Sequence, residues 1–196
     1  MSKLEEVKPD SLSKVTKTLT SCLPRPSVLD GTADFVVNLA DLPLLTEEEA
    51  LEFLDSNVLT SGMELLLQQA FARIAGEKSA KGIYKLSESM GGGKTQSMLV
   101  AGILARFPYL AKNVGFQKPL PEAKTDVVAS FTGRSTDQQV WVSIGKQLGV
   151  EFPAERAPSE TEWRDALKDQ AALILLDELA FYFVHAASQG AKDEGT

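Results

Sequence analysis

The chain has 196 residues, of which 43% are hydrophobic and 24% are charged, a composition that is ordinary for one soluble globular domain. Its 20 basic and 27 acidic residues give a net charge of -7, which disfavours direct binding to nucleic acid or to an anionic membrane. The single cysteine, Cys22, excludes an internal disulfide, and one cysteine with one histidine disfavours a metal site of these residue types. The N-terminal residues carry no signal-peptide core and no long apolar run follows, so we expect a cytoplasmic protein outside the membrane.

By composition the chain divides into three parts. Residues 1 to 32 are polar, carry alternating charges and contain several prolines, which is typical of an irregular arm. Residues 33 to 79 are expected to form a helical lead-in, and residues 80 to 196 the core of the fold. Within the lead-in, residues 33 to 45 predict a strand followed by a turn.

Two capping boxes predict where helices begin in the lead-in. Thr46 and Glu49 have the spacing of such a box, and so do Ser61 and Glu64. After the second box, apolar residues recur at three- and four-residue spacing, which is typical of a helix face packed on a core. Gly76 stands where this helix is expected to end.

In the core, segments whose pattern predicts strands alternate with segments whose pattern predicts helices. Strands are predicted at residues 82 to 86, 125 to 133 and from 171 to the acids at 177 and 178. Helices are predicted at 94 to 107, at 136 to 149, after a capping box of Ser159 and Glu162, and beyond the acids. This alternation predicts an α/β fold with a parallel sheet that is flanked by helices on both faces.

The segment SESMGGGKT matches the phosphate-loop pattern G-x-x-x-x-G-K-[ST], except that Glu88 replaces the first glycine. Gly91 to Gly93 allow the positive φ angles and the close approach with which backbone N–H groups wrap a phosphate. The partial positive charge at the start of the following helix supports the same role. Lys94 would reach the outer phosphates, and the Thr95 hydroxyl would ligate magnesium.

Residues beside the glycines complete the predicted site. Ser89 and Met90 are expected to line the nucleotide, and the backbone N–H of Gln96 is expected to meet the α-phosphate. The Glu88 side chain should point away from the ligand, because a carboxylate repels phosphate. The alternative is a tight turn between a strand and a helix that binds no ligand.

The second motif is LILLDE, which places Asp177 and Glu178 at the end of an apolar strand. Ligands of a parallel α/β sheet bind at the carboxyl ends of its strands. Asp177 would hold magnesium through water, and Glu178 would orient and deprotonate the attacking water. Alternatively, the two acids only cap the following helix. No N-K-x-D motif for guanine is present, which favours ATP over GTP.

Other residues have structural interpretations. Trp141 and Trp163 are expected to anchor helices, and residues 181 to 183 to pack an aromatic cluster on the sheet. His185 is expected to have a packing or surface role. Residues 132 to 134, at the end of a predicted strand, are interpreted as a surface turn that can alternatively touch a ligand.

Four stretches resemble the N-terminal part of a family of large prokaryotic AAA-like P-loop ATPases, encoded in phage-defence gene clusters of the BREX and DISARM type: LTSGMELLLQQAFARIAG, YKLSESMGGGKTQSMLVAGILA, WVSIGKQLG and LILLDELAFYFVHAA. The resemblance runs from Phe35 to Ser188. It implies a P-loop NTPase core that uses ATP and Mg²⁺, with Gly91 to Thr95 as the loop and Asp177 and Glu178 as the metal and catalytic acids. It further implies partners such as a DNA methyltransferase, contact with DNA through the assembly, and homo-oligomers.

Members of that family are longer, and in such ATPases a strand that follows the acids inserts between the loop strand and the Asp strand. Here the sequence ends after SQGAKDEGT, with no later strand, sensor residue or arginine finger. We therefore expect an incomplete core that a longer chain or a partner completes. Three functions remain open: an ATPase that drives a defence assembly, an ATP-dependent oligomerisation switch, and a nucleotide-binding scaffold that does not hydrolyse ATP.

Overall fold

Two parallel strands lie at the centre of the described part of the chain. The computed structural model describes residues 37 to 87, 93 to 135 and 137 to 193, with side chains as far as Ser188. Strand β1 (Val127–Thr132) pairs with β2 (Ala172–Asp177), and Thr132 stands opposite Asp177 in the register. Both strands therefore end at the same edge of the sheet, and the fold is α/β as expected.

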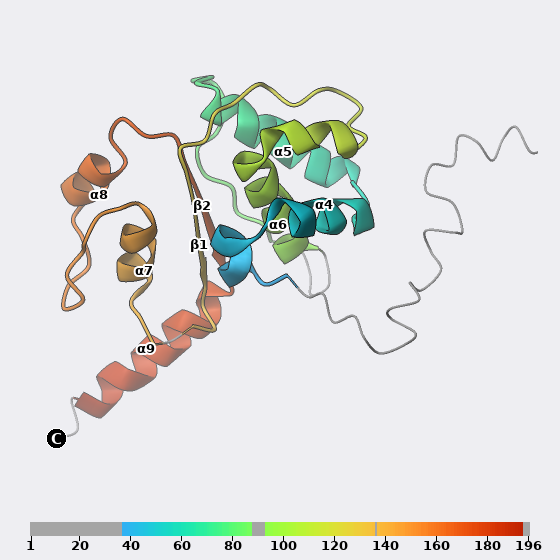
Figure 1. Ribbon diagram of the computed structural model, residues 1–196. Helices are drawn as coiled ribbons and strands as arrows, with labels where there is room; N and C mark the ends of the chain where they lie inside the picture. Colours follow the sequence, from blue (N-terminus) through green and yellow to red (C-terminus); the bar gives the residue numbers. More distant parts are fainter. Residues whose placement is uncertain (1–36, 88–92, 136, 194–196) are drawn as a thin grey trace, which may run out of the picture. The chain divides into compact units, whose positions relative to one another are not determined.

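Helices cover both faces of these strands (Figure 1). Alternate side chains point to opposite faces, so that Leu175 joins one hydrophobic cluster whereas Phe131 joins the other. The Leu175 face packs on η1 (Leu39–Leu44), α4 (Glu47–Ser56), α5 (Ser61–Ile74), α6 (Lys94–Arg106) and η2 (Pro108–Asn113). The Phe131 face packs on α7 (Val140–Gln147), α8 (Glu160–Ala166) and α9 (Leu179–Asp193). None of the described helices combines the length and apolar character needed to cross a bilayer.

Helix α6 is buried along most of its length, as its sequence predicts. Its residues Leu99 to Ala105 are all buried, between the sheet and the elements that precede it in the chain. Gly102 allows the close approach, because a Cβ atom there would lie 2.9 Å from the Leu175 side chain and 2.3 Å from that of Leu42. The helix begins at Lys94, so this packing also determines where Lys94 and Thr95 lie.

Several predicted helix ends are confirmed. Thr46 and Glu49 form the complete capping box of α4, and Ser159 and Glu162 form that of α8. Gly76 has a φ of 95° and its N–H bonds the Arg73 carbonyl, while Glu77 N–H bonds the Ala72 carbonyl. These two bonds close the end of α5 as a Schellman motif.

One predicted helix start is wrong by one residue. The N-cap of α5 is Thr60, whose hydroxyl accepts a hydrogen bond from Met63 N–H, whereas Ser61 is the first helical residue. Glu64 does not complete a box, because its carboxylate accepts the backbone N–H groups of Gln117 and Lys118 instead. Hydrogen bonds from Glu64 to a distant segment thus take the place of the expected bond to the start of its own helix.

Two predicted strands are also wrong within the described residues. Residues 81 to 87 form no strand, and Ile83 is 89% exposed. A strand needs a neighbour to bond its backbone groups, and no described strand lies beside this segment. Of the strand and turn predicted at residues 33 to 45, residues 33 to 36 lie outside the described residues. Residues 39 to 44 form the 3-10 helix η1 instead, since Leu39 and Leu42, three apart, both face the core.

The outer edge of β1 is closed by a side chain of α7. Gln147 accepts the Ser130 N–H at 2.9 Å through Oε1 and donates to the Ser130 carbonyl at 2.8 Å through Nε2. Its amide thus bonds both backbone groups as a neighbouring strand would.

Replacing Gln147 with alanine should lower the free energy of unfolding by about 1–3 kcal/mol, because two backbone groups of β1 lose their partners. Urea denaturation followed by circular dichroism measures the change. Lys146→Ala, at the adjacent exposed position, is the control and should change stability by less than about 0.5 kcal/mol. Equal midpoints for the two variants would show that the amide does not stabilise the edge.

Candidate functional site

The first turn of α6 meets the carboxyl end of β2. The Thr95 hydroxyl donates a hydrogen bond to Asp177 Oδ2 at 2.5 Å, across 82 positions of sequence. A short bond of this kind is typical of a hydroxyl that donates to a carboxylate. The two motifs that the sequence singles out, GGGKT and LILLDE, therefore lie together.

The backbone before α6 has the conformation that its glycine permits. Gly93 is the N-cap, with a φ of 72° and a ψ of 20° in the left-handed region. Its carbonyl accepts Ser97 N–H at 2.8 Å and the Ser97 hydroxyl at 2.9 Å. Lys94 and Thr95 follow as the first helical residues, and the first turn carries no acidic side chain. The partial positive charge at this helix start is therefore not neutralised from within its own turn.

The remaining loop predictions lie outside the described residues. They concern the position of the Glu88 side chain and the roles of Ser89, Met90, Gly91 and Gly92. Gln96 is described, and its side chain does not extend freely from α6. Its Nε2 donates to Asn57 Oδ1, and Asn57 Nδ2 donates to the Phe53 carbonyl at 2.6 Å. The prediction for the Gln96 backbone N–H is unaffected by this contact.

Asp177 and Glu178 have different environments although they are adjacent. Asp177 accepts the Thr95 hydroxyl through Oδ2 and the backbone N–H of Glu178 through Oδ1, the latter at 2.9 Å. Glu178 has a φ of 51°, which is left-handed backbone and strained for a residue with a side chain. Glu178 is the single residue between the end of β2 and the start of α9.

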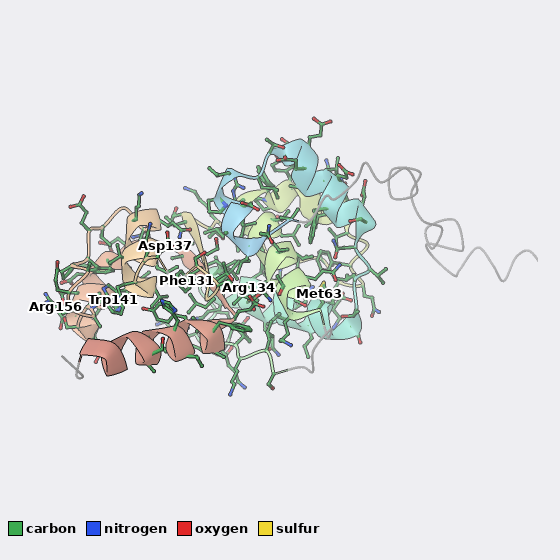
Figure 2. The ribbon with its side chains drawn as sticks, turned by 90° about the horizontal axis from the view of Figure 1, so that it is seen from below. Met63, Phe131, Arg134, Asp137, Trp141 and Arg156 are labelled. Atoms are coloured by element: carbon green, nitrogen blue, oxygen red, sulfur yellow. The ribbon has the colours of Figure 1, made fainter. Side chains whose placement is uncertain are left out.

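The Glu178 carboxylate is engaged by Arg134, which follows the end of β1. Arg134 Nη2 donates to Glu178 Oε1 at 2.8 Å, and Arg134 Nε donates to Oε2, so the pair is bidentate. The guanidinium also lies 5.5 Å from the centre of the Phe181 ring, near the start of α9 (Figure 2). Its hydrogen bond with Glu178 and the charge of that carboxylate raise the pKa of Arg134. The guanidinium therefore stays charged at every physiological pH.

The interpretation of residues 132 to 134 as only a surface turn is incomplete, because it misses this ion pair. A sequence signal for the pair exists. The strands predicted at 125 to 133 and from 171 to the acids end next to Arg134 and Glu178, so these two residues meet if the strands are parallel neighbours in register. The register was not readable from the sequence.

Gly133 allows the turn after β1 to contact the turn after β2. Its N–H donates to the Asp177 carbonyl at 2.8 Å. A Cβ atom at Gly133 would lie only 2.1 Å from the Glu178 carbonyl oxygen, which is backbone and cannot move independently. The glycine thus sets how closely Arg134 and Glu178 approach each other.

The predictions for the aromatic residues are confirmed for the two tryptophans and only partly for residues 181 to 183. Trp141 donates its ring N–H to the Pro153 carbonyl at 2.9 Å, and Trp163 packs on Phe152, which confirms both as anchors. Of the predicted cluster at 181 to 183 only Tyr182 is buried, whereas Phe181 is 59% and Phe183 is 61% exposed. Successive helical residues point in different directions, so three in a row cannot share one face.

The oxygens of Thr95 and Asp177 fit a magnesium ion. Mg²⁺ prefers hard oxygen ligands, and it is often held by one or two protein oxygens together with water and substrate phosphates. Among the described residues, no three histidine, cysteine or acidic side chains gather as a group that holds a metal by itself. A metal at this place would therefore take its other ligands from water or from a bound nucleotide.

Comparisons of the chain with family profiles, with curated proteins and with solved structures found no significant match.

Replacing Gly133 with alanine should destabilise the fold by about 1–3 kcal/mol, because the new methyl group overlaps the Glu178 backbone. The change also separates the turns that carry Arg134 and Glu178. Thermal unfolding measures the loss.

The matched control is Gly62→Ala in the first turn of α5, where a Cβ meets nothing within 4 Å. That variant should be neutral or more stable by up to about 1 kcal/mol. Similar behaviour of the two variants would contradict the close approach at Gly133.

Proposed function

We propose that the chain is the ATP-binding part of an ATPase of a prokaryotic anti-phage defence system, which couples ATP turnover to a larger DNA-directed assembly. The observation that supports this most is the hydrogen bond from Thr95 to Asp177. It joins a helix start that follows three glycines to an acid at the carboxyl end of a parallel strand. Phosphate and metal chemistry requires both at one place.

Each residue has a role in this proposal. The Lys94 ammonium contacts the outer phosphates, and the backbone from Gly91 to Gly93 wraps them. The Thr95 hydroxyl and the Asp177 carboxylate hold Mg²⁺, which when bound neutralises charge on the triphosphate. Glu178 orients the attacking water and accepts its proton. The P-loop NTPase core is thus the proposed identity of the observed α/β unit.

The assignment to phage defence rests on the resemblance of the four stretches described above. It brings the proposed partners with it: a DNA-modifying protein such as a methyltransferase, DNA contacted through the assembly, and further copies of this chain. The net charge of -7 agrees with contact to DNA through a partner rather than directly.

A second function is supported by the state of Glu178. Its carboxylate is occupied by Arg134, so it does not act as a base for water until this pair opens. A chain that binds ATP without efficient turnover, as a switch for oligomerisation or as a scaffold, is consistent with this arrangement.

Lys94→Ala should weaken the binding of fluorescent ATP, measured with Mg²⁺ by anisotropy, by about 10–100-fold, because a charged hydrogen-bond donor to phosphate is lost. Lys146→Ala removes an exposed lysine on α7 and should bind ATP as the wild type does. Unchanged binding in Lys94→Ala would refute the assignment of the site.

The Arg134–Glu178 pair separates the two candidate functions. Glu178→Gln should retain ATP binding and, in an ATPase, lose about 10²–10⁴-fold in turnover, because the general base is gone. Arg134→Ala should raise turnover, because it frees the carboxylate. The measurement is phosphate release under single-turnover conditions.

Arg164→Ala is the control, since Arg164 pairs with Glu160 at the surface of α8. Phosphate release at the rate of buffer in wild type and Arg134→Ala alike would favour the switch or scaffold.

A further inference from the structure

A cavity lies directly beside the first turn of α6. It has a volume of about 300 Å³, which is at the lower end for ligand pockets. Its apolar lining comes from Met63, Leu66 and Leu86, and its polar lining includes Thr60, Lys94 and Ser97. The helices α5 and α6 therefore supply two of its walls, and Met63 of α5 can be located in Figure 2.

The lining of the cavity is partly apolar and carries no group that repels an anionic ligand. None of the described residues that line the cavity is acidic, and Lys94 is the one cation among them. The hydroxyl of Ser97 donates to the Gly93 carbonyl, and that of Thr60 accepts Met63 N–H. Thioether sulfur makes favourable contacts with aromatic rings, often at the ring edge, and aliphatic side chains add dispersion contacts.

The turn between α4 and α5 is tied to the first turn of α6 by a side-chain hydrogen bond. Asn57, in the turn before α5, is buried and accepts a hydrogen bond from Gln96 of the first turn of α6. Asn57 also donates to the Phe53 carbonyl of α4. The cavity is thus formed by the packing of the protein, as is usual for ligand pockets.

The position of Lys94 connects the cavity with the candidate phosphate site. Lys94 lines the cavity, and the next residue, Thr95, bonds Asp177. A larger apolar groove of about 800 Å³, between Phe71, Phe116 and Leu120, includes none of these residues. Of the two, only the smaller cavity continues from the place where phosphates are proposed to bind.

We propose that this cavity, the base pocket, receives the base of the nucleoside triphosphate whose phosphates bind at Lys94 and Thr95. The inference rests on the proposed function. It assigns Leu66 and Leu86 to contact with the base, and it gives Asn57 and Gln96 a role in positioning the turn before α5 against the first turn of α6. The sequence did not indicate this role, because the apolar stripe of α5 predicts only a core face.

The test compares ATP with inorganic tripolyphosphate, which has the phosphates but no base. Leu66→Trp fills the base pocket and should weaken ATP binding by at least about tenfold. Tripolyphosphate binding should stay within about twofold of wild type, because the substitution leaves Lys94 and Thr95 themselves unchanged. Both affinities are measured by isothermal titration calorimetry with Mg²⁺.

Leu65→Trp is the matched control, because Leu65 is exposed on the same helix and does not line the cavity. It should bind both ligands as the wild type does. If Leu66→Trp does not fold, Leu66→Ala decides, with ATP binding weakened about threefold to tenfold and tripolyphosphate binding unchanged.

Two results would overturn the inference: wild-type ATP affinity in the Leu66 variants, or equal losses for ATP and tripolyphosphate. Lys94→Ala distinguishes this failure from failure of the proposed function. If Lys94→Ala weakens both ligands while the Leu66 variants weaken neither, the phosphate site stands and the base pocket is wrong. If Lys94→Ala weakens neither ligand, the nucleotide site itself is wrong, and the base pocket with it.

Discussion

The hydrogen bond between Thr95 and Asp177 joins the two elements that form the candidate site. Thr95 is held in place by the buried helix that it begins, whose Gly102 allows close packing against Leu175 of β2. Asp177 is held by the parallel pairing of β2 with β1. Because each partner is positioned by an extensive core, the bond between them reports the geometry of the whole sheet edge. We propose that the carboxylate and the hydroxyl fixed in this way bind a cation together.

The same edge also holds Glu178 in a restrained state. Gly133 brings the turn after β1 against the turn after β2, and Arg134 then engages both oxygens of the carboxylate. Glu178 lies in left-handed backbone, so the surrounding structure imposes a conformation that this residue does not favour by itself. Strain and a bidentate partner at one acid are features of a group whose availability can change. The state of Glu178 is the reason why we propose a nucleotide-binding switch beside an ATPase.

Elements were predictable where a short stretch of sequence supplies its own hydrogen bonds and its own packing face. The capping boxes of α4 and α8, the Schellman end of α5 at Gly76 and the apolar runs of β1 and β2 belong to this class. The predictions failed where the hydrogen bonds of a segment depend on residues far away in the sequence. Glu64 bonds the backbone near residue 117 rather than its own helix start, and residues 82 to 86 have no described strand beside them. Backbone groups follow whichever partner the fold brings closest.

Local pattern was enough to single out the two motifs that meet at the candidate site, and the chemistry proposed for them rests on the groups that glycine, lysine, threonine and aspartate supply in any fold. It was also enough to predict an α/β architecture, since apolar periodicity is a property of consecutive residues. Only the tertiary structure decided which groups meet: Thr95 with Asp177, Arg134 with Glu178, Gln96 with Asn57, and the walls of α5 and α6 around one cavity. These contacts depend on strand register and helix packing. Both are determined by interactions between segments that are distant in the sequence, so no single segment predicts them.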